Sequence, residues 1–63
     1  MLGKTLKTLR IKKGFSQNEL AVKLGFKNRA SICFFENGKQ QPTLKTLKRY
    51  AKVFGISLGE FIK

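Results

Sequence analysis

Apolar residues recur at every third or fourth position through most of the chain, which is the period of an amphipathic α-helix. In the first segment Leu2, Leu6 and Leu9 share one face, and lysines occupy the others. Gly14 is placed to end this helix, because glycine readily adopts the left-handed backbone that closes a helix. The pattern predicts a first helix from Leu2 to Lys13.

A second helix is predicted from a capping box, Ser16-x-x-Glu19. In this motif the serine hydroxyl accepts from the backbone N–H of the glutamate, and the glutamate carboxylate accepts from that of the serine. The helix should begin near Gln17 and break at Gly25. Its inner face is expected to contain Leu20, Ala21 and Leu24.

A third helix is predicted after Asn28, which is a favourable N-cap residue. Asn37-Gly38 is a strong stop signal, so this helix should run to about Glu36.

The adjacent Phe34 and Phe35 cannot both face the core, since neighbours in a helix point about 100° apart. If Phe35 points inward together with Ile32, Phe34 must point outward, and Ala30 shares that outward face.

The remaining sequence contains two further helix patterns. Thr43 can cap a fourth helix that Gly55 ends, with Tyr50 at its flank, and Ser57 can cap a last short helix. The apolar positions of the fourth helix, Leu44, Leu47, Ala51 and Phe54, are expected to face inward. The last helix carries Leu58, Phe61 and Ile62. Because no strand-like alternation, linker or repeat is present, residues 1–63 are predicted to form one all-α domain of five short helices.

The charge balance adds a requirement for a polyanionic partner. Fourteen Lys and Arg residues against three acidic residues give a formal charge of +11, which is self-repulsive without counterions. Nucleic acid is the first candidate partner, and an anionic membrane surface is the second. Since there is no apolar run long enough to span a bilayer and no signal-peptide pattern, no membrane partner is expected and the predicted location is the cytoplasm.

Catalysis and metal binding are not expected from this composition. The chain has no histidine, no aspartate and one cysteine, so neither a zinc site nor an intramolecular disulfide can be built. We therefore predict that the protein is not an enzyme and has no cofactor. Cys33 is interpreted as an inert thiol, with a redox switch as the alternative.

Two short helices joined by a glycine-containing turn in a strongly basic chain indicate a helix-turn-helix unit over residues 16–37, whose second helix enters the DNA major groove. Further residues occur together at fixed spacings: Arg10, Ser16-Gln17-x-x-Leu20-Ala21, Gly25, Ile32, Glu36-Asn37-Gly38 and Pro42. From residue 6 to residue 61 the sequence resembles the phage-repressor and Cro type (XRE) family of helix-turn-helix domains. The resemblance implies a compact five-helix fold similar to that of lambda repressor.

The same resemblance implies three sets of site residues. The base-contacting residues of the recognition helix would be Arg29, Ala30 and Phe34. The phosphate-contacting residues would be Gln17, Asn28, Asn37, Gly38, Lys39 and Gln40, which position the domain rather than select a sequence. Arg10 and Glu36 would form a structural ion pair. An arginine can bond guanine O6 and N7 together, whereas alanine and phenylalanine can only contact the methyl group of thymine.

Alternatives remain open for several of these residues. The interval from Gly25 to Ile32 is one residue longer than in the family pattern, so the third helix could start one residue away from its expected position. Three other interpretations of Phe34 remain open. The third helix could be rotated, the ring could simply cover the core at the domain edge, or it could belong to a protein interface. Arg29 and Gln17 could be ordinary solvated residues.

The predicted function is sequence-specific binding of double-stranded DNA by a repressor-like transcriptional regulator of bacterial or phage origin. One recognition helix contacts only a few base pairs, so a homodimer on a two-fold operator is predicted, weak in isolation or formed on DNA. Residues 56–62 could supply its contact. The alternative is a DNA-binding antitoxin, or another interaction module of this fold, with a small protein partner. A membrane-active cationic peptide is a third hypothesis, which the capping and glycine pattern disfavours.

Overall fold

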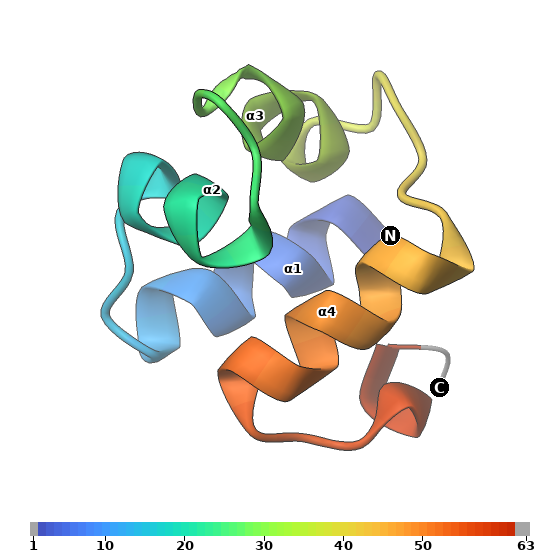
Figure 1. Cartoon of the computed structure of the whole chain (residues 1–63). Helices are drawn as coiled ribbons and strands as arrows, with labels where there is room; N and C mark the ends of the chain where they lie inside the picture. The colour runs from blue at the N-terminus through green and yellow to red at the C-terminus, as the bar shows by residue number, and fades with distance from the viewer. Residues whose placement is uncertain (1, 62–63) are drawn as a thin grey trace.

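A computed structural model describes residues 2–61. Its elements are α1 (Leu2–Lys12), α2 (Gln17–Leu24), α3 (Ala30–Glu36), α4 (Leu44–Phe54) and a short 3-10 helix, η1 (Leu58–Phe61). Figure 1 shows α2 and α3 joined by a short turn on one side of the molecule, and α2 packs against both α3 and α4. The all-α prediction is confirmed.

The expected fifth helix is not an α-helix. Among residues 2–61 there are four α-helices, and η1 is a four-residue 3-10 segment in which the N–H of Glu60 donates to the carbonyl of Ser57 at 3.1 Å. So short a segment favours the tighter 3-10 bonding, because it cannot build a run of α-helical bonds. Ile62, which was expected to belong to this helix, lies outside the described residues.

The core is built from the inner faces of all these elements. Its buried apolar residues are Leu6, Leu20, Ala21, Leu24, Ile32, Phe35, Leu47, Tyr50, Ala51, Phe54 and Phe61. Ile56 and Leu58 pack against it as partly buried neighbours. The apolar side chains of residues 56–61 are therefore largely used within the domain, which leaves little of that segment for the predicted dimer contact.

Tyr50 was expected at the flank of the fourth helix, and that prediction is wrong. Its side chain has 0% exposure, and its ring lies 5.6 Å from that of Phe54 and 6.3 Å from those of Phe35 and Phe61, centroid to centroid. The physical reason is helical phase, since Tyr50 is one turn after Leu47 and one turn before Phe54, both of which are buried.

Leu44 was expected to point into the core, and this is also wrong, because it is 59% exposed. It is the first residue of α4, whose cap is formed by Thr43 Oγ1 accepting from the N–H of Thr46 at 3.2 Å. The first core residue of α4 is Leu47. The opening turn of α4 therefore extends past the edge of the core.

The start of α1 lies very close to the end of α3. A Cβ atom added at Gly3 would lie 2.5 Å from the carbonyl oxygen of Phe35 and 2.6 Å from that of Glu36. No ordinary side chain tolerates such distances to backbone atoms, so glycine is required for this close approach. The contact sets the distance between α1 and the C-terminal end of α3.

Candidate nucleic-acid interface

The N-terminus of α2 is held by the predicted capping box. Ser16 Oγ accepts from the N–H of Glu19 at 3.0 Å, and Glu19 Oε1 accepts from the N–H of Ser16 at 2.9 Å. The bond that the carboxylate accepts from the backbone N–H of Ser16 lowers the pKa of Glu19, and the side chain of Ser16 lowers it further. Desolvation opposes this change slightly, and Lys23 adds a smaller lowering effect on the pKa. The box defines where α2 begins and therefore where Gln17 is presented.

The turn between α2 and α3 closes as the glycine predicts. Gly25 has φ of 87°, in the left-handed region, and its N–H donates to the carbonyl of Val22 at 3.1 Å. The N–H of Phe26 donates to the carbonyl of Ala21 at 2.9 Å, which completes a Schellman-type ending. The ring of Phe26 then packs edge-on against Phe35 of α3, with centroids 5.9 Å apart.

The sequence predicted Asn28 as the N-cap of the third helix, but the helix begins one residue later than that. Arg29 occupies the N-cap position without a side-chain cap, and α3 starts at Ala30. Asn28 nevertheless serves the helix start, because its Oδ1 accepts from the N–H of Ala30 at 2.9 Å. The longer interval before Ile32 is thus absorbed in the turn, and the side-chain amide nitrogen of Asn28 keeps its donors.

The face that α3 turns to solvent carries the three predicted base-contacting residues. Arg29 and Ala30 are exposed, and Phe34 is 43% exposed. Ile32 and Phe35 are buried in the core, which excludes a rotated helix as the explanation of Phe34. The structure therefore brings Arg29 and Ala30 onto one accessible surface with Phe34, which lies about one helical turn further along α3.

The segment after α3 folds back on the last turn of that helix. The N–H groups of Lys39 and Gln40 both donate to the carbonyl of Phe34, at 3.0 and 3.2 Å, and Asn37 Oδ1 accepts from the N–H of Lys39 at 3.1 Å. Gly38, with φ of 81°, allows the reversal. All four residues from Asn37 to Gln40 are exposed. Because the backbone donors of Lys39 and Gln40 are used internally, their side chains are the groups that face solvent.

Arg10 and Glu36 lie together as a two-bonded ion pair. Arg10 Nε lies 2.6 Å from Glu36 Oε2, and Arg10 Nη2 donates to Oε1 at 3.2 Å. Arg10 Nη1 also donates to the carbonyl of Phe15 at 2.9 Å. The pair therefore links α1, the loop before α2 and the end of α3.

Gln17 joins this pair, a contact that the sequence did not predict. Its Nε2 donates to Glu36 Oε1 at 3.2 Å, so the residue is neither free nor fully solvated. Glu36 directly precedes Asn37, so this bond connects Gln17, at the start of α2, to the residue next to the expected phosphate-contacting segment after α3. No local motif could have shown this contact, since its partners are nineteen residues apart.

Arg49 is a second residue that the sequence interpretation missed. Its Nη1 donates to the carbonyl of Leu24 at 3.2 Å, at the C-terminal end of α2. A guanidinium at this position stabilises a helix end, because it bonds an orphan carbonyl and faces the negative end of the helix dipole. In the sequence Arg49 was one of several cations on the outer face of the fourth helix, and nothing in the pattern indicated its bond to Leu24, 25 residues away.

Cys33 is half-buried, and its thiol is free. The side-chain amide of Asn37 approaches its sulfur at 3.7 Å. Within residues 2–61, no group of three or more His, Cys, Asp or Glu side chains could hold a metal ion. No helix in that part of the chain is both long and apolar enough to cross a membrane.

A family model described as helix-turn-helix matches residues 6–61 of this sequence. The chain belongs to the XRE-type helix-turn-helix family. The predicted resemblance is confirmed over almost the whole domain. The proteins compared below are transcriptional regulators and a controller protein, in agreement with the prediction that the chain is not an enzyme.

Curated relatives share the domain but are longer than this chain. The SPbeta prophage-derived HTH-type transcriptional regulator YonR of Bacillus subtilis is 38% identical over 63 residues, covering all of this chain and 57% of that protein. The Escherichia coli regulator PuuR is 39% identical over 94% of this chain and 31% of its own length. An HTH-type regulator of Archaeoglobus fulgidus is 41% identical over 87% of this chain and 77% of its own length. The chain thus spans little more than half of YonR.

Two solved structures have the same fold. The structure of SinR, described as the master regulator for biofilm formation in complex with DNA, superposes with a TM-score of 0.90, at 28% identity and with both chains fully covered. The restriction-modification controller protein C.AhdI from Aeromonas hydrophila gives a TM-score of 0.87 at 30% identity, covering 95% of this chain and 89% of its own.

Proposed function

We propose that this chain is a domain of a transcriptional regulator and that it binds double-stranded DNA in a sequence-specific manner. In this proposal α3 is the recognition helix. The observation that carries the proposal is the solvent-facing surface formed by Arg29, Ala30 and Phe34. Ile32 and Phe35 anchor the opposite face of α3 in the core, so the exposed face is held in a defined orientation. Membership of the helix-turn-helix family supports the same conclusion.

The three residues of this surface suit two kinds of base contact. Arg29 stands at the N-terminal end of the helix, where its planar guanidinium can donate two hydrogen bonds to one guanine. Ala30 and Phe34 carry no hydrogen-bonding group, so they select bases by apolar contact with thymine methyl groups. The preferred half-site should therefore combine a guanine with one or more nearby thymines.

Phosphate contacts would hold α3 in register with the groove. Gln17 Nε2 uses one hydrogen on Glu36 and has a second one to donate, and it stands at the positive end of the α2 dipole. Asn37, Gly38, Lys39 and Gln40 form an exposed segment at the other end of α3. Asn28 retains its amide donors for the same purpose. The net charge of +11 adds a sequence-independent attraction that weakens as salt rises.

A dimer on a two-fold operator is part of the proposal. One helix contacts too few base pairs for useful selectivity, and two half-sites about one DNA turn apart require two domains related by a two-fold axis. The protein would act in the cytoplasm, where the chromosome lies. Residues 56–61 are largely packed into the core, which favours pairing that DNA brings about over a strong free dimer.

The test is selection of bound duplexes from a randomised pool at near-physiological salt, with sequencing of the retained fraction. The wild-type chain should enrich a two-fold motif. Arg29→Ala should lose preference at one base position of each half-site, by roughly 1 to 3 kcal/mol. Arg29→Lys keeps the positive charge but lacks the planar guanidinium that donates two parallel hydrogen bonds. It should therefore lose the same base preference while retaining more overall DNA affinity than Arg29→Ala.

Lys12→Ala is the matched control, since it removes one positive charge from an exposed residue at the end of α1. It should leave the enriched motif unchanged. Retention of duplexes without any enriched motif, falling steeply with salt, would show a charge-driven binder and refute sequence-specific recognition by α3.

A further inference from the structure

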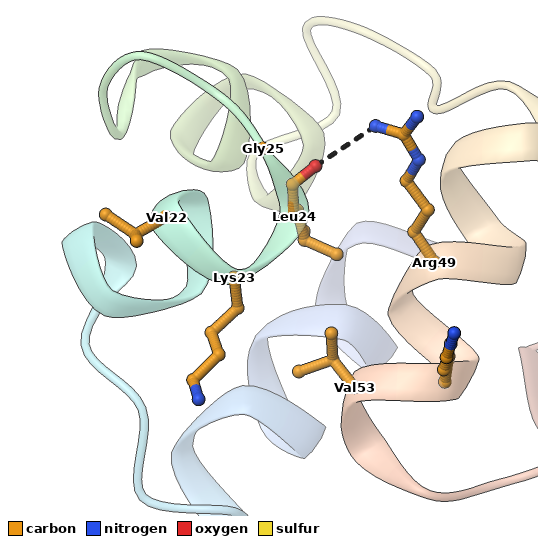
Figure 2. Close-up of a pocket in the computed structure, with 7 residues that line it drawn as sticks. Val22, Lys23, Leu24, Gly25, Arg49 and Val53 are labelled. Carbon is orange, nitrogen blue, oxygen red and sulfur yellow. Dashed lines mark hydrogen bonds between the residues drawn. The ribbon is translucent and has the colours of Figure 1, made fainter.

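A shallow pocket of about 540 Å³ lies between the C-terminal end of α2 and the middle of α4. Figure 2 shows Lys23 and Leu24 directed from α2 toward this space, with Val53 and Arg49 approaching from α4. The pocket is open along one side. It would therefore take part of a larger molecule more readily than it would enclose a small ligand.

The floor of the pocket is apolar and only partly covered. Leu24 is a buried core residue at the base of the pocket, and Val53 is partly buried against the core. Val22 also lines the pocket and is 76% exposed, but Figure 2 shows its side chain at the outer edge, directed away from Val53. An apolar side chain from a partner would remove this surface from water, which is favourable by about 25 cal/mol per Å².

The rim of the pocket is positively charged, and one of its charges is fixed in place. Arg49 Nη1 is bonded to the carbonyl of Leu24, so the guanidinium is held over the pocket with donors to spare. Lys23 and Lys52 complete the rim. A guanidinium already ordered loses less side-chain entropy when it binds a carboxylate, which strengthens such a contact.

Three alternative occupants fit this pocket less well than an acidic partner. A second copy would bring another net charge of +11 against the rim. Two of the chain's three acidic residues, Glu19 and Glu36, are used in the capping box and in the ion pair with Arg10. Duplex DNA would supply negative charge, but its phosphates offer no side chain to cover Val22 and Val53.

We infer that the pocket is a docking site for an acidic segment of a protein partner, which places separate apolar side chains on Val22 and on Val53 and a carboxylate on Arg49. Lys23 and Lys52 hold further acidic residues at the rim. Gln17 stands at the opposite end of α2, about 10 Å away along the helix axis. This surface is thus distinct from the residues proposed to contact phosphate at the start of α2, and it does not depend on the proposed DNA-binding function.

The experiment is a titration of the isotope-labelled protein with a short amphipathic peptide of glutamate and leucine at helical spacing, followed by amide chemical shifts. A second peptide, in which serine replaces every leucine, has the same charge. Shift changes should centre on residues 22–25 and 49–53 with the first peptide, and the second should bind about tenfold more weakly. Val22→Ser and Lys52→Glu should each weaken binding of the leucine peptide by about fivefold or more.

Leu44→Ser and Lys45→Glu are the matched controls, because they make the same chemical changes at exposed positions of α4 outside the pocket. Both should bind the leucine peptide as the wild type does. Absence of binding, equal binding of the two peptides, or shift changes centred on α3 would each overturn the inference. A greater loss of duplex affinity for Lys52→Glu than for Lys45→Glu would assign the pocket to the DNA surface instead.

Discussion

Arg10 on α1 and Glu36 at the end of α3 form a bidentate ion pair whose carboxylate also accepts from Gln17 of α2. The side chains are only 11% and 4% exposed, respectively. One carboxylate thus joins the first helix to both helices of the helix-turn-helix unit. It lies immediately before the segment that begins at Asn37, so the pair links the stability of the domain to the position of its proposed phosphate contacts.

Removal of one partner of this pair should be strongly destabilising. Arg10→Met leaves the Glu36 carboxylate buried without its counter-ion, and a loss of roughly 3 to 5 kcal/mol in the free energy of unfolding is expected. The double variant Arg10→Met with Glu36→Leu should lose less than the single variant, because no charge is then left buried. Urea unfolding followed by circular dichroism measures both, and a double variant less stable than Arg10→Met would contradict the explanation.

The hydroxyl of Tyr50 has no hydrogen-bond partner among residues 2–61, although it is buried. Burying an unsatisfied polar group costs roughly 1 to 3 kcal/mol, so Tyr50→Phe should keep the domain at least as stable as the wild type. Thermal unfolding of the two proteins at neutral pH tests this. A clear fall in stability would mean that the hydroxyl makes a favourable contact.

Burial raises the pKa of Tyr50 above its usual value, with a smaller increase from Glu36 and an opposing effect from Arg10. In the unfolded chain the phenol ionises near pH 10, roughly its ordinary value. The stability that depends on its protonated form is therefore present below that pH and is lost as the pH rises above it. Tyr50 is the chain's one tyrosine, so tyrosinate absorbance reports it directly. Ionisation should accompany loss of helical circular dichroism, and complete ionisation of a still-folded protein would refute this prediction.

Gly3→Ala should destabilise the domain, although alanine normally favours a helix over glycine by about 1 kcal/mol. The added methyl group would meet the carbonyls of Phe35 and Glu36, so α1 must move away from α3. A loss of about 2 kcal/mol or more is expected in urea unfolding. Gly59→Ala is the control, because its Cβ would meet only Ser57 Oγ, at 3.9 Å, and should change stability by less than about 0.5 kcal/mol.

Phe34 should distinguish thymine from uracil in the operator recovered by selection. Replacing the contacted thymine by uracil removes one methyl group, which should weaken wild-type binding by about 0.8 kcal/mol, or roughly fourfold. Phe34→Ala should be indifferent to that replacement, and its folding stability should change little because the ring is partly exposed. Fluorescence anisotropy with each thymine replaced in turn measures the effect. Equal sensitivity of both proteins at every thymine would exclude the contact.

Helix ends and helical phase were largely predictable from the sequence, because they depend on residues a few positions apart. The capping box of Ser16 and Glu19 and the left-handed Gly25 are present as predicted. The start of α3 was missed by one residue, because Asn28 bonds the N–H of Ala30 from one position further out. The outward position of Phe34 followed from its phase relative to Ile32 and is confirmed by its exposure.

By itself the sequence determined an all-α helix-turn-helix domain with a strongly positive net charge and with Phe34 on the exposed face of its third helix. Caps, glycines and the apolar period act locally, which is why they could be interpreted without the fold. Only the tertiary structure decided which side chains meet across helices: Gln17 with Glu36, Arg49 with the carbonyl of Leu24, and Gly3 with the end of α3. It also placed Tyr50 at the centre of the core rather than at its flank. Helical phase gives the direction of a side chain, but its partner depends on how the helices pack, which contacts distant in sequence determine together.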